Sequence, residues 1–215
     1  MIDLYTWATP NGRKVSIALE ELGLDYEVNP INIAEGDQFS AEFTAISPNQ
    51  KIPAIYDHDN GITLMESGAI LMYLAEKAGQ LLPKDPVKYW DTIQWLMWQK
   101  SAFGPMLGLA LHYLKFNPGK STYSEERFRK ETYRLYGVLD MQLANQKYIV
   151  GNEYTIADIA TWPWVARHEF QTVDLNDFPQ VMAWYLRIAE HPAVQRGWGV
   201  PTHDEVPMPK QTKTD

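Results

Sequence analysis

Residues 2–33 read IDLYTWATPNGRKVSIALEELGLDYEVNPINI, and this stretch indicates the fold of the first part of the chain. Ile2–Tyr5 has the alternation of a short strand, and a second strand is expected over Tyr26–Ile33. Between them, apolar residues recur at the spacing of one helix face, at Val15, Ala18, Leu19 and Leu22. The order strand, helix, strand favours two parallel strands joined by a crossover helix. Pro30 has no N–H to donate, so the second strand is predicted to lie at an edge of the sheet.

Residues 34–79 continue the same pattern. A polar loop over Ala34–Gln38 precedes a short helix expected over Ser40–Ile46. Lys51–Tyr56 and Ile62–Met65 predict two strands of a hairpin, because a turn-rich segment separates them. Ser67–Lys77 then predicts a helix, which Gly79 ends. The expected order over the first 79 residues is therefore βαβαββα.

Two prolines within Leu82-Pro83-Lys84-Asp85-Pro86 mark a domain boundary. We expect a first domain over residues 1–81, a linker over 82–87 and an all-helical domain over 88–200. Its predicted helices cover Tyr89–Leu114, with a kink at Gly104-Pro105, and Ser124–Gln146, Thr155–Phe170 and Pro179–Glu190. The polar tail over residues 201–215 is expected to be disordered.

The composition excludes several kinds of chemistry. The 215 residues include no cysteine, so a disulfide, a cysteine-ligated metal and a cysteine nucleophile are all excluded. The 27 acidic and 19 basic residues give a net charge of −8, which argues against a nucleic acid or an anionic membrane as partner. No apolar stretch approaches the ~20 residues that span a bilayer, and the first residues lack a secretory-signal pattern. We therefore expect a cytoplasmic protein.

Three local motifs carry a resemblance to a known family. Residues 47–53 read Ser-Pro-Asn-Gln-Lys-Ile-Pro, residues 66–70 read Glu-Ser-Gly-Ala-Ile, and residues 155–158 read Thr-Ile-Ala-Asp. In this order and at this spacing they resemble the cis-proline segment, the γ-glutamyl-binding signature and the helix-capping box of the cytosolic glutathione transferases. The resemblance covers roughly residues 1–200. It implies a thioredoxin-like first domain, a helical second domain, glutathione as co-substrate and a homodimer.

Residues 8–14, Ala-Thr-Pro-Asn-Gly-Arg-Lys, indicate a subclass. They resemble the Ser/Thr-Pro-Asn-Gly-x-Lys turn of the nu-class enzymes, bacterial relatives of the yeast nitrogen-regulator prion protein. Residues 95–108 and Trp162-Pro163-Trp164 also look like that group. The resemblance implies a glutathione-dependent disulfide-bond oxidoreductase in place of a detoxifying aryl transferase.

The turn at Thr9–Asn11 is the candidate catalytic feature. A thiol has a pKa of ~8.5, and only its thiolate is the nucleophile. Thr9 and Asn11 can each donate a hydrogen bond to a sulfur at the positive end of the following helix. Thr9 is alternatively a plain helix N-cap with Pro10 at the first helical position. Tyr5, which lies within the strand, is interpreted as a packing residue.

Further residues are candidates for binding glutathione. A cis Ile52-Pro53 bond would present the main chain of Ile52 to the cysteinyl unit of the peptide. Glu66 suits the γ-glutamyl ammonium, and Ser67 with the helix start suits its carboxylate. The alternatives are an ordinary edge-strand proline and an ordinary helix entry.

Lys51 and Gln38 are candidates for the glycine carboxylate, although a lysine beside a sheet is commonly just solvated. The family resemblance implies that Arg134 reaches glutathione across the dimer interface. A surface ion pair with Glu131 is the alternative, and such pairs contribute little to stability. The five histidines show no metal-ligand spacing, so no metal is expected.

The leading hypothesis is glutathione-dependent reduction of small disulfides by thiol–disulfide exchange, which requires no protein cysteine. Conjugation of glutathione to electrophiles or reduction of organic peroxides is a second hypothesis, because the same thiolate would serve. A non-catalytic binding module is a third, since fold does not determine function.

Overall fold

The computed structural model describes residues 1–210, and its chain divides into two compact units. The first unit contains Met1–Leu82 together with Glu190–Val206. The second contains Pro83–Ala189 and the described residues that follow Val206. Residues 211–215, the end of the tail predicted to be disordered, lie outside the described residues.

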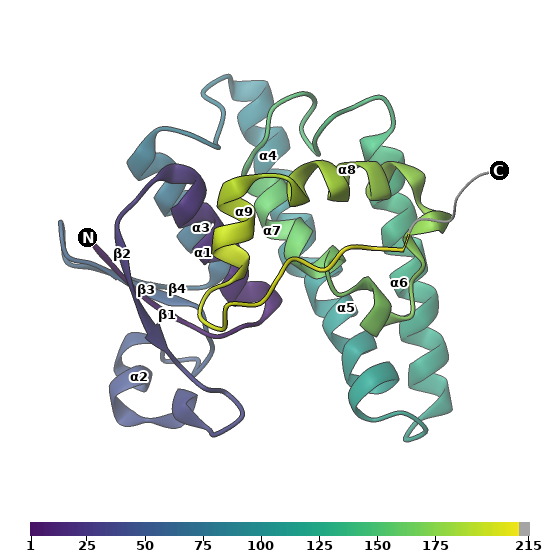
Figure 1. Cartoon of the computed structure of the whole chain (residues 1–215), viewed down its shortest axis with the longest axis horizontal. Helices are drawn as coiled ribbons and strands as arrows, with labels where there is room; N and C mark the ends of the chain where they lie inside the picture. Colours follow the sequence, from purple (N-terminus) through teal and green to yellow (C-terminus); the bar gives the residue numbers. More distant parts are fainter. Residues whose placement is uncertain (211–215) are drawn as a thin grey trace. The chain divides into compact units, whose positions relative to one another are not determined.

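A four-stranded mixed sheet forms the centre of the first unit (Figure 1). Its strands are β1 (Ile2–Thr6), β2 (Tyr26–Pro30), β3 (Ala54–Asp57) and β4 (Ile62–Met65), in the order β2-β1-β3-β4. β1 and β2 are parallel, while β1–β3 and β3–β4 are antiparallel. The predictions of a parallel first pair, of an edge strand containing Pro30 and of a hairpin are therefore confirmed.

The helices of this unit are α1 (Pro10–Leu22), α2 (Ala41–Ile46), α3 (Ser67–Ala78) and α9 (Pro192–Trp198). In Figure 1, α1 and α3 lie on one side of the sheet and α2 lies on the other. α1 begins after Thr9 and ends at Gly23, whose φ of 62° is left-handed and therefore favours glycine. The expected βαβαββα order is observed, followed by a helix that the sequence pattern did not predict.

That additional helix, α9, packs against α1. Gly197 permits the contact, because a Cβ at this position would lie 2.6 Å from the Cα of Ile17. The expectation of a helix ending before His191-Pro192 missed it, although Pro192 at the first helical position is a start signal. The segment up to Val206 also joins the first unit, in contrast to the expected boundary and to the disorder predicted from Pro201.

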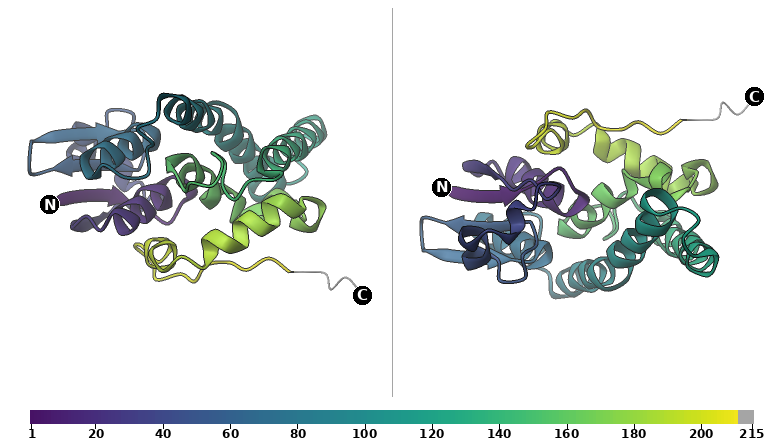
Figure 2. Two further views of the ribbon diagram at one scale, coloured as in Figure 1. Left: turned by 90° about the horizontal axis from the view of Figure 1, so that it is seen from above. Right: turned by 90° about the horizontal axis from the view of Figure 1, so that it is seen from below.

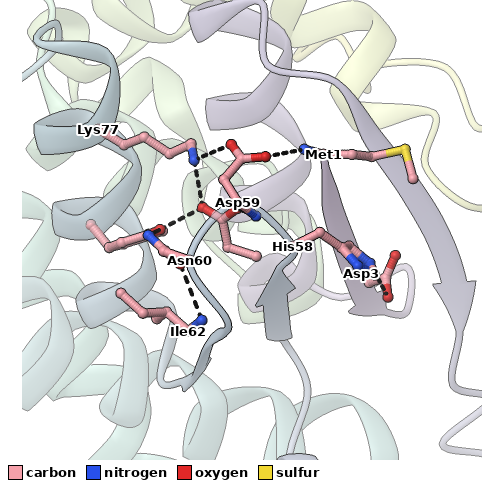
Figure 3. A network of polar contacts seen from close by, with 9 residues as sticks. Met1, Asp3, His58, Asp59, Asn60, Ile62 and Lys77 are labelled. Carbon is pink, nitrogen blue, oxygen red and sulfur yellow. Dashed lines mark hydrogen bonds and ion pairs between the residues drawn. The ribbon is translucent and has the colours of Figure 1, made fainter.

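A polar network ties the β3–β4 hairpin to α3 (Figure 3). The fully buried Asp57 carboxylate accepts a hydrogen bond from Lys77 Nζ at 2.7 Å and another from the Tyr73 hydroxyl. Lys77 also pairs with Asp59 at 2.6 Å, and Asp59 pairs with the Met1 amino group at 3.0 Å. The network therefore anchors the end of β3 to the last turn of α3.

The second unit is helical, as expected. It contains α4 (Pro86–Trp98), α5 (Gly104–Leu111), α6 (Thr122–Leu143), α7 (Ile156–Val165) and α8 (Pro179–Ala189). α5 and α6 lie side by side, and Figure 2 shows them from two further directions. A π-helical turn over Gln99–Phe103 immediately precedes Gly104-Pro105, where a kink was predicted, and a second π turn covers His112–Phe116.

α7 is buried along its whole length, and a capping box closes its N-terminal end. Thr155 and Asp158 form a reciprocal capping box, and Asp158 also accepts bonds from Ile149 N–H at 2.9 Å and Trp184 Nε1 at 2.8 Å. The helix is shorter than predicted, because the chain turns into a 3₁₀ segment at His168–Gln171. Across the described part of the chain, no helix is long and apolar enough to cross a membrane.

Candidate active site

The strand register brings three chain segments to one edge of the sheet. Tyr5 of β1 pairs with Ala54 of β3, and Ala54 in turn pairs with Met65 of β4. The end of β1, the start of β3 and the end of β4 are therefore neighbours. The turn after β1 carries Thr9 and Asn11, the residues before β3 include Ile52, and those after β4 are Glu66 and Ser67.

Thr9 is the N-cap of α1. Its hydroxyl oxygen accepts a hydrogen bond from the Gly12 N–H at 3.2 Å, and Pro10 occupies the first helical position. This is the capping role that the sequence offered as an alternative. It leaves the hydroxyl proton able to donate, because a hydroxyl is both acceptor and donor. The capping role and a contact with a thiolate are therefore compatible at Thr9.

The start of α1 favours an anion. The half-buried Asn11 lies in its first turn, and that turn contains no acidic residue to offset the positive end of the helix. Gly12 keeps the turn compact, since a Cβ there would lie 2.2 Å from the Trp7 carbonyl oxygen. The first-turn N–H groups and the Asn11 side chain can thus serve as donors to a negatively charged sulfur.

Tyr5 packs against a neighbouring aromatic ring. Its ring contacts Phe43 with centroids 6.2 Å apart. Burial, and then the charge of Asp3, raise the pKa of its phenol above the ordinary value. The neutral phenol is therefore favoured, as expected of a side chain that packs beside the sheet.

Ile52 and Pro53 form a cis peptide at the start of β3. Ser47 Oγ donates to the carbonyl oxygen of Lys51 at 2.9 Å and so holds the loop before Ile52. Within residues 1–210, no hydrogen bond uses the main-chain N–H or C=O of Ile52. The Lys51 side chain is exposed.

Glu66 has a φ of 70°, in the left-handed region that favours glycine. A non-glycine residue held there is strained, and such residues gather at ligand-binding sites. The Glu66 side chain is exposed and makes no capping bond to α3, whereas Ser67, the first residue of α3, is buried. The Glu66 carboxylate, which can bind an ammonium group, thus lies beside the start of α3, which can bind a carboxylate. Together they suit the ammonium and the carboxylate of one amino acid.

The other two candidates have different surroundings. Gln38, in the short 3₁₀ turn Asp37–Phe39, has a buried amide oxygen with no hydrogen-bond partner among residues 1–210. Arg134 lies on α6 of the second unit and forms a bidentate ion pair with Glu131, with N–O distances of 2.8 and 2.7 Å. The hydrogen bond from Arg134 lowers the pKa of Glu131. The intrahelical ion pair is therefore present in the structure.

A metal centre is not apparent in the described residues, which contain no cluster of three potential ligands among His, Cys, Asp and Glu. His58 and His191 each contact a single carboxylate, Asp3 and Glu21 respectively, at 2.9 Å.

Comparison with known proteins gives the family. Residues 1–76 match the profile described as "Glutathione S-transferase, N-terminal domain", and residues 103–192 match "Glutathione S-transferase, C-terminal domain". This chain belongs to the glutathione S-transferase family. The transferase is 48% identical over 198 residues to the disulfide-bond oxidoreductase YfcG of Escherichia coli, covering 90% of this chain and 92% of that protein. It is 43% identical over 212 residues to YghU of the same organism, named likewise, covering 91% and 73%.

Solved structures of transferases with bound glutathione are also similar. One from Burkholderia graminis, with two glutathione molecules per subunit, is 41% identical with a TM-score of 0.89, covering 94% of this transferase and 89% of that chain. One from Pseudomonas putida, with a glutathione disulfide per subunit, is 43% identical with a TM-score of 0.88, covering 93% and 91%. The expected fold class and family are confirmed.

The sequence pattern missed the surroundings of Arg13. This residue of the Thr9–Lys14 motif is fully buried, pairs with Asp204 and stacks on the Trp198 ring at 3.7 Å. Arg13 and Asp204 are 191 residues apart in sequence, so no local signal connects them.

Proposed function

We propose that this transferase reduces small disulfides with glutathione. The similarity to YfcG over 92% of that protein, which is named a disulfide-bond oxidoreductase, carries the proposal. The complete absence of cysteine agrees with it, because the protein then provides no thiol of its own. The attacking, attacked and leaving sulfurs of each exchange step all come from ligands.

The exchange proceeds in two balanced steps. The thiolate of bound glutathione attacks one sulfur of the substrate disulfide, forming a mixed disulfide and releasing the other half as a thiolate. A second glutathione thiolate attacks the glutathione sulfur of the mixed disulfide, giving glutathione disulfide and the second substrate thiolate. Solvent protons neutralise the released thiolates. The protein's task is to hold the attacking sulfur ionised and aligned.

Thr9 and Asn11 donate to that sulfur in this proposal. The open hydroxyl proton of Thr9 and the first turn of α1, free of acidic residues, support the assignment. Both side chains lie at the same helix start, so either can donate to the same sulfur.

The peptide part of glutathione then lies along the edge formed by β3 and β4. Ile52 pairs with the cysteinyl main chain, Glu66 binds the γ-glutamyl ammonium, and Ser67 with the start of α3 binds the γ-glutamyl carboxylate. Lys51 and Gln38 are assigned to the glycine carboxylate. The shared sheet edge supports the first three roles.

A homodimer, a nu-class assignment and a cytoplasmic location belong to the same proposal. Arg134 of one protomer is proposed to contact glutathione held by its partner. The bidentate bond to Glu131 uses Nε and Nη2, so Nη1 stays available in the proposal for a second carboxylate.

The test is reduction of a model disulfide by the purified transferase, coupled to glutathione reductase and NADPH. The wild type is expected to accelerate the reaction, and the double variant Thr9→Ala/Asn11→Ala to lose about 10- to 100-fold of that activity. Ser121→Ala is a matched control, because it removes the N-cap of α6 in the second unit. A wild-type rate equal to the uncatalysed rate contradicts the proposal.

A substrate panel separates the alternatives. Strong conjugation of glutathione to an electrophile, or strong peroxide reduction, with negligible disulfide reduction would place the same thiolate in another reaction. If the tryptophan fluorescence of the wild-type protein does not respond to millimolar glutathione, a non-catalytic binding module is favoured.

A further inference from the structure

A buried cation lies one turn from the proposed thiolate site. Arg13 is 1% exposed and occupies the first turns of α1, four residues after the cap Thr9. Its guanidinium lies 3.7 Å from the centre of the Trp198 ring and pairs with Asp204 through Nη2. A cation near a helix N-terminus adds to the positive potential already there, so its burial requires compensation.

The compensating carboxylate comes from the end of the chain. The segment after α9 is held near α1 by Ser16 Oγ, which donates to the Gly197 carbonyl oxygen at 2.7 Å. Trp198 Nε1 donates to the Glu205 carbonyl oxygen at 2.8 Å, and this bond closes the loop that carries Asp204. The Thr202 hydroxyl donates to Asp204 Oδ2 at 2.8 Å. The hydrogen bonds of Thr202 and of Trp198 thus hold the loop so that Asp204 contacts Arg13.

Helix geometry places this pair within electrostatic range of the thiolate. Four residues of α-helix rise about 6 Å, and side chains lean toward the helix N-terminus. The Arg13 guanidinium is therefore on the order of 8–10 Å from a sulfur bound at the start of α1. At that distance and partial burial, one charge changes the pKa of a thiol by about 0.5–1 unit.

We propose that Arg13 and Asp204 are positioning residues that together set how strongly the start of α1 ionises the glutathione thiol. The Arg13 cation favours the thiolate, and the Asp204 carboxylate, delivered by the C-terminal segment, moderates that effect. The inference rests on the proposed function, because it concerns glutathione bound at Thr9 and Asn11. It gives the segment after α9 a part in tuning the site.

Other ionisable groups lie on α1, on the elements packed against it and on the segment that follows α9, and they are unchanged in the Arg13 and Asp204 variants below. They belong to α1 itself, to β1, to α3, to α9 and to the following segment: Lys14, Asp3, Glu76, Lys77, His191, Arg196, His203 and Glu205. Two of them are already paired with α1, as Arg196 with Glu20 at 2.6 Å and His191 with Glu21 at 2.9 Å. These pairs lie toward the C-terminal end of α1.

The experiment measures the pKa of the thiol of bound glutathione, from the pH dependence of thiolate ultraviolet absorbance at saturating glutathione. Arg13→Gln is expected to raise this pKa by about 0.5–1 unit, because the cation is lost while Asp204 stays. Asp204→Asn is expected to lower it by a similar amount, because Arg13 keeps its charge. Arg13→Lys, which keeps a cation, is expected to restore most of the wild-type value.

Opposite signs distinguish this role from a structural one, since damage to the fold would move both variants the same way. Asp204 is half-exposed, so its variant keeps the test usable even if Arg13→Gln does not fold. Arg196→Gln is the matched control, because its partner Glu20 is about 16 Å of helix rise from Thr9, beyond the ~10 Å Debye length at 0.1 M salt. Its pKa is expected to equal that of the wild type.

Shifts of the same sign, or no shift in either variant while glutathione binds, would overturn the inference alone. Failure of the wild type to bind glutathione would overturn the proposed function and this inference with it.

Discussion

Replacing Asp57 by Asn is expected to destabilise the first unit in a way that depends on pH. Asp57 is fully buried at the end of β3 and accepts bonds from Lys77, from Tyr73 and from the Asp59 N–H at 3.0 Å. Asparagine has nearly the same shape but carries no charge. The change therefore removes the charge-assisted part of the network and leaves the packing of the hairpin on α3 largely intact.

The magnitude follows from the pKa of Asp57. Burial alone would raise it, but the hydrogen bonds from Lys77, Tyr73 and the Asp59 N–H lower it from 3.8 to about 2. A shift of this size corresponds to about 2 kcal/mol of stability at neutral pH. Lys77 is 22% exposed, so solvent reaches the pair and the expected loss is about 1–2 kcal/mol.

The sign of the pH dependence is determined by the direction of the shift. A depressed carboxyl pKa contributes stability that is present above the unfolded value near 4 and is lost as pH falls toward 2. The difference in unfolding free energy between wild type and Asp57→Asn is therefore expected to be constant from pH 5 to 7. It should shrink toward zero between pH 4 and 2.

Urea unfolding at several pH values, followed by a probe in the first unit, measures this difference. Asp59→Asn is the control, because Asp59 lies at the exposed end of the same network and its loss is expected to be smaller. A difference that persists unchanged to pH 2, or an Asp59→Asn loss equal to that of Asp57→Asn, would refute the electrostatic reasoning.

Three further predictions concern other parts of the chain. Glu66→Gln is expected to raise the KM for glutathione about tenfold with a smaller effect on kcat, measured in the coupled assay; an unchanged KM would remove Glu66 from the ligand. Asp158→Ala is expected to lower the stability of the second unit by about 3–5 kcal/mol, because the capping box and the Trp184 bond are lost in a buried site, and a loss below 1 kcal/mol in urea unfolding would contradict this. Gly197→Ala is expected to cost about 1–3 kcal/mol and to increase hydrogen exchange in α9, since the new Cβ meets the Ile17 main chain; unaltered exchange would speak against it.

Much of the fold was predictable because its signals are local. The apolar spacing in Val15–Leu22, the turn between the hairpin strands and the missing N–H of Pro30 each act within a few residues. The four strands, the parallel first pair and the hairpin followed from these signals and from the short connections, whereas the antiparallel pairing of β1 with β3 did not. Helix ends deviated where a π or 3₁₀ turn replaced the regular pattern, as at Gln99–Phe103 and His168–Gln171.

The candidate site was only partly accessible in this way. Thr9, Ile52, Glu66 and Ser67 could be proposed from motif spacing, and the strand register brings their segments to one sheet edge. The left-handed backbone of Glu66 and the buried amide oxygen of Gln38 had no signal in the sequence. The ion pair between Arg134 and Glu131 was predictable as an alternative, since the two residues are three apart on one helix.

The amino-acid sequence by itself determined the absence of cysteine, the order of strands and helices over the first 79 residues, and the family motifs, because each of these is a property of residue types or of near neighbours. The tertiary structure decided where the segment from α9 to Val206 lies. Asp204 meets Arg13 across 191 residues, through the glycine contact at Gly197 and the ring of Trp198. Such a pairing depends on the packing of α9 against α1, and no periodicity or composition encodes it. The residues from Pro201 to Val206, predicted to be disordered, therefore belong to the unit that carries the candidate site.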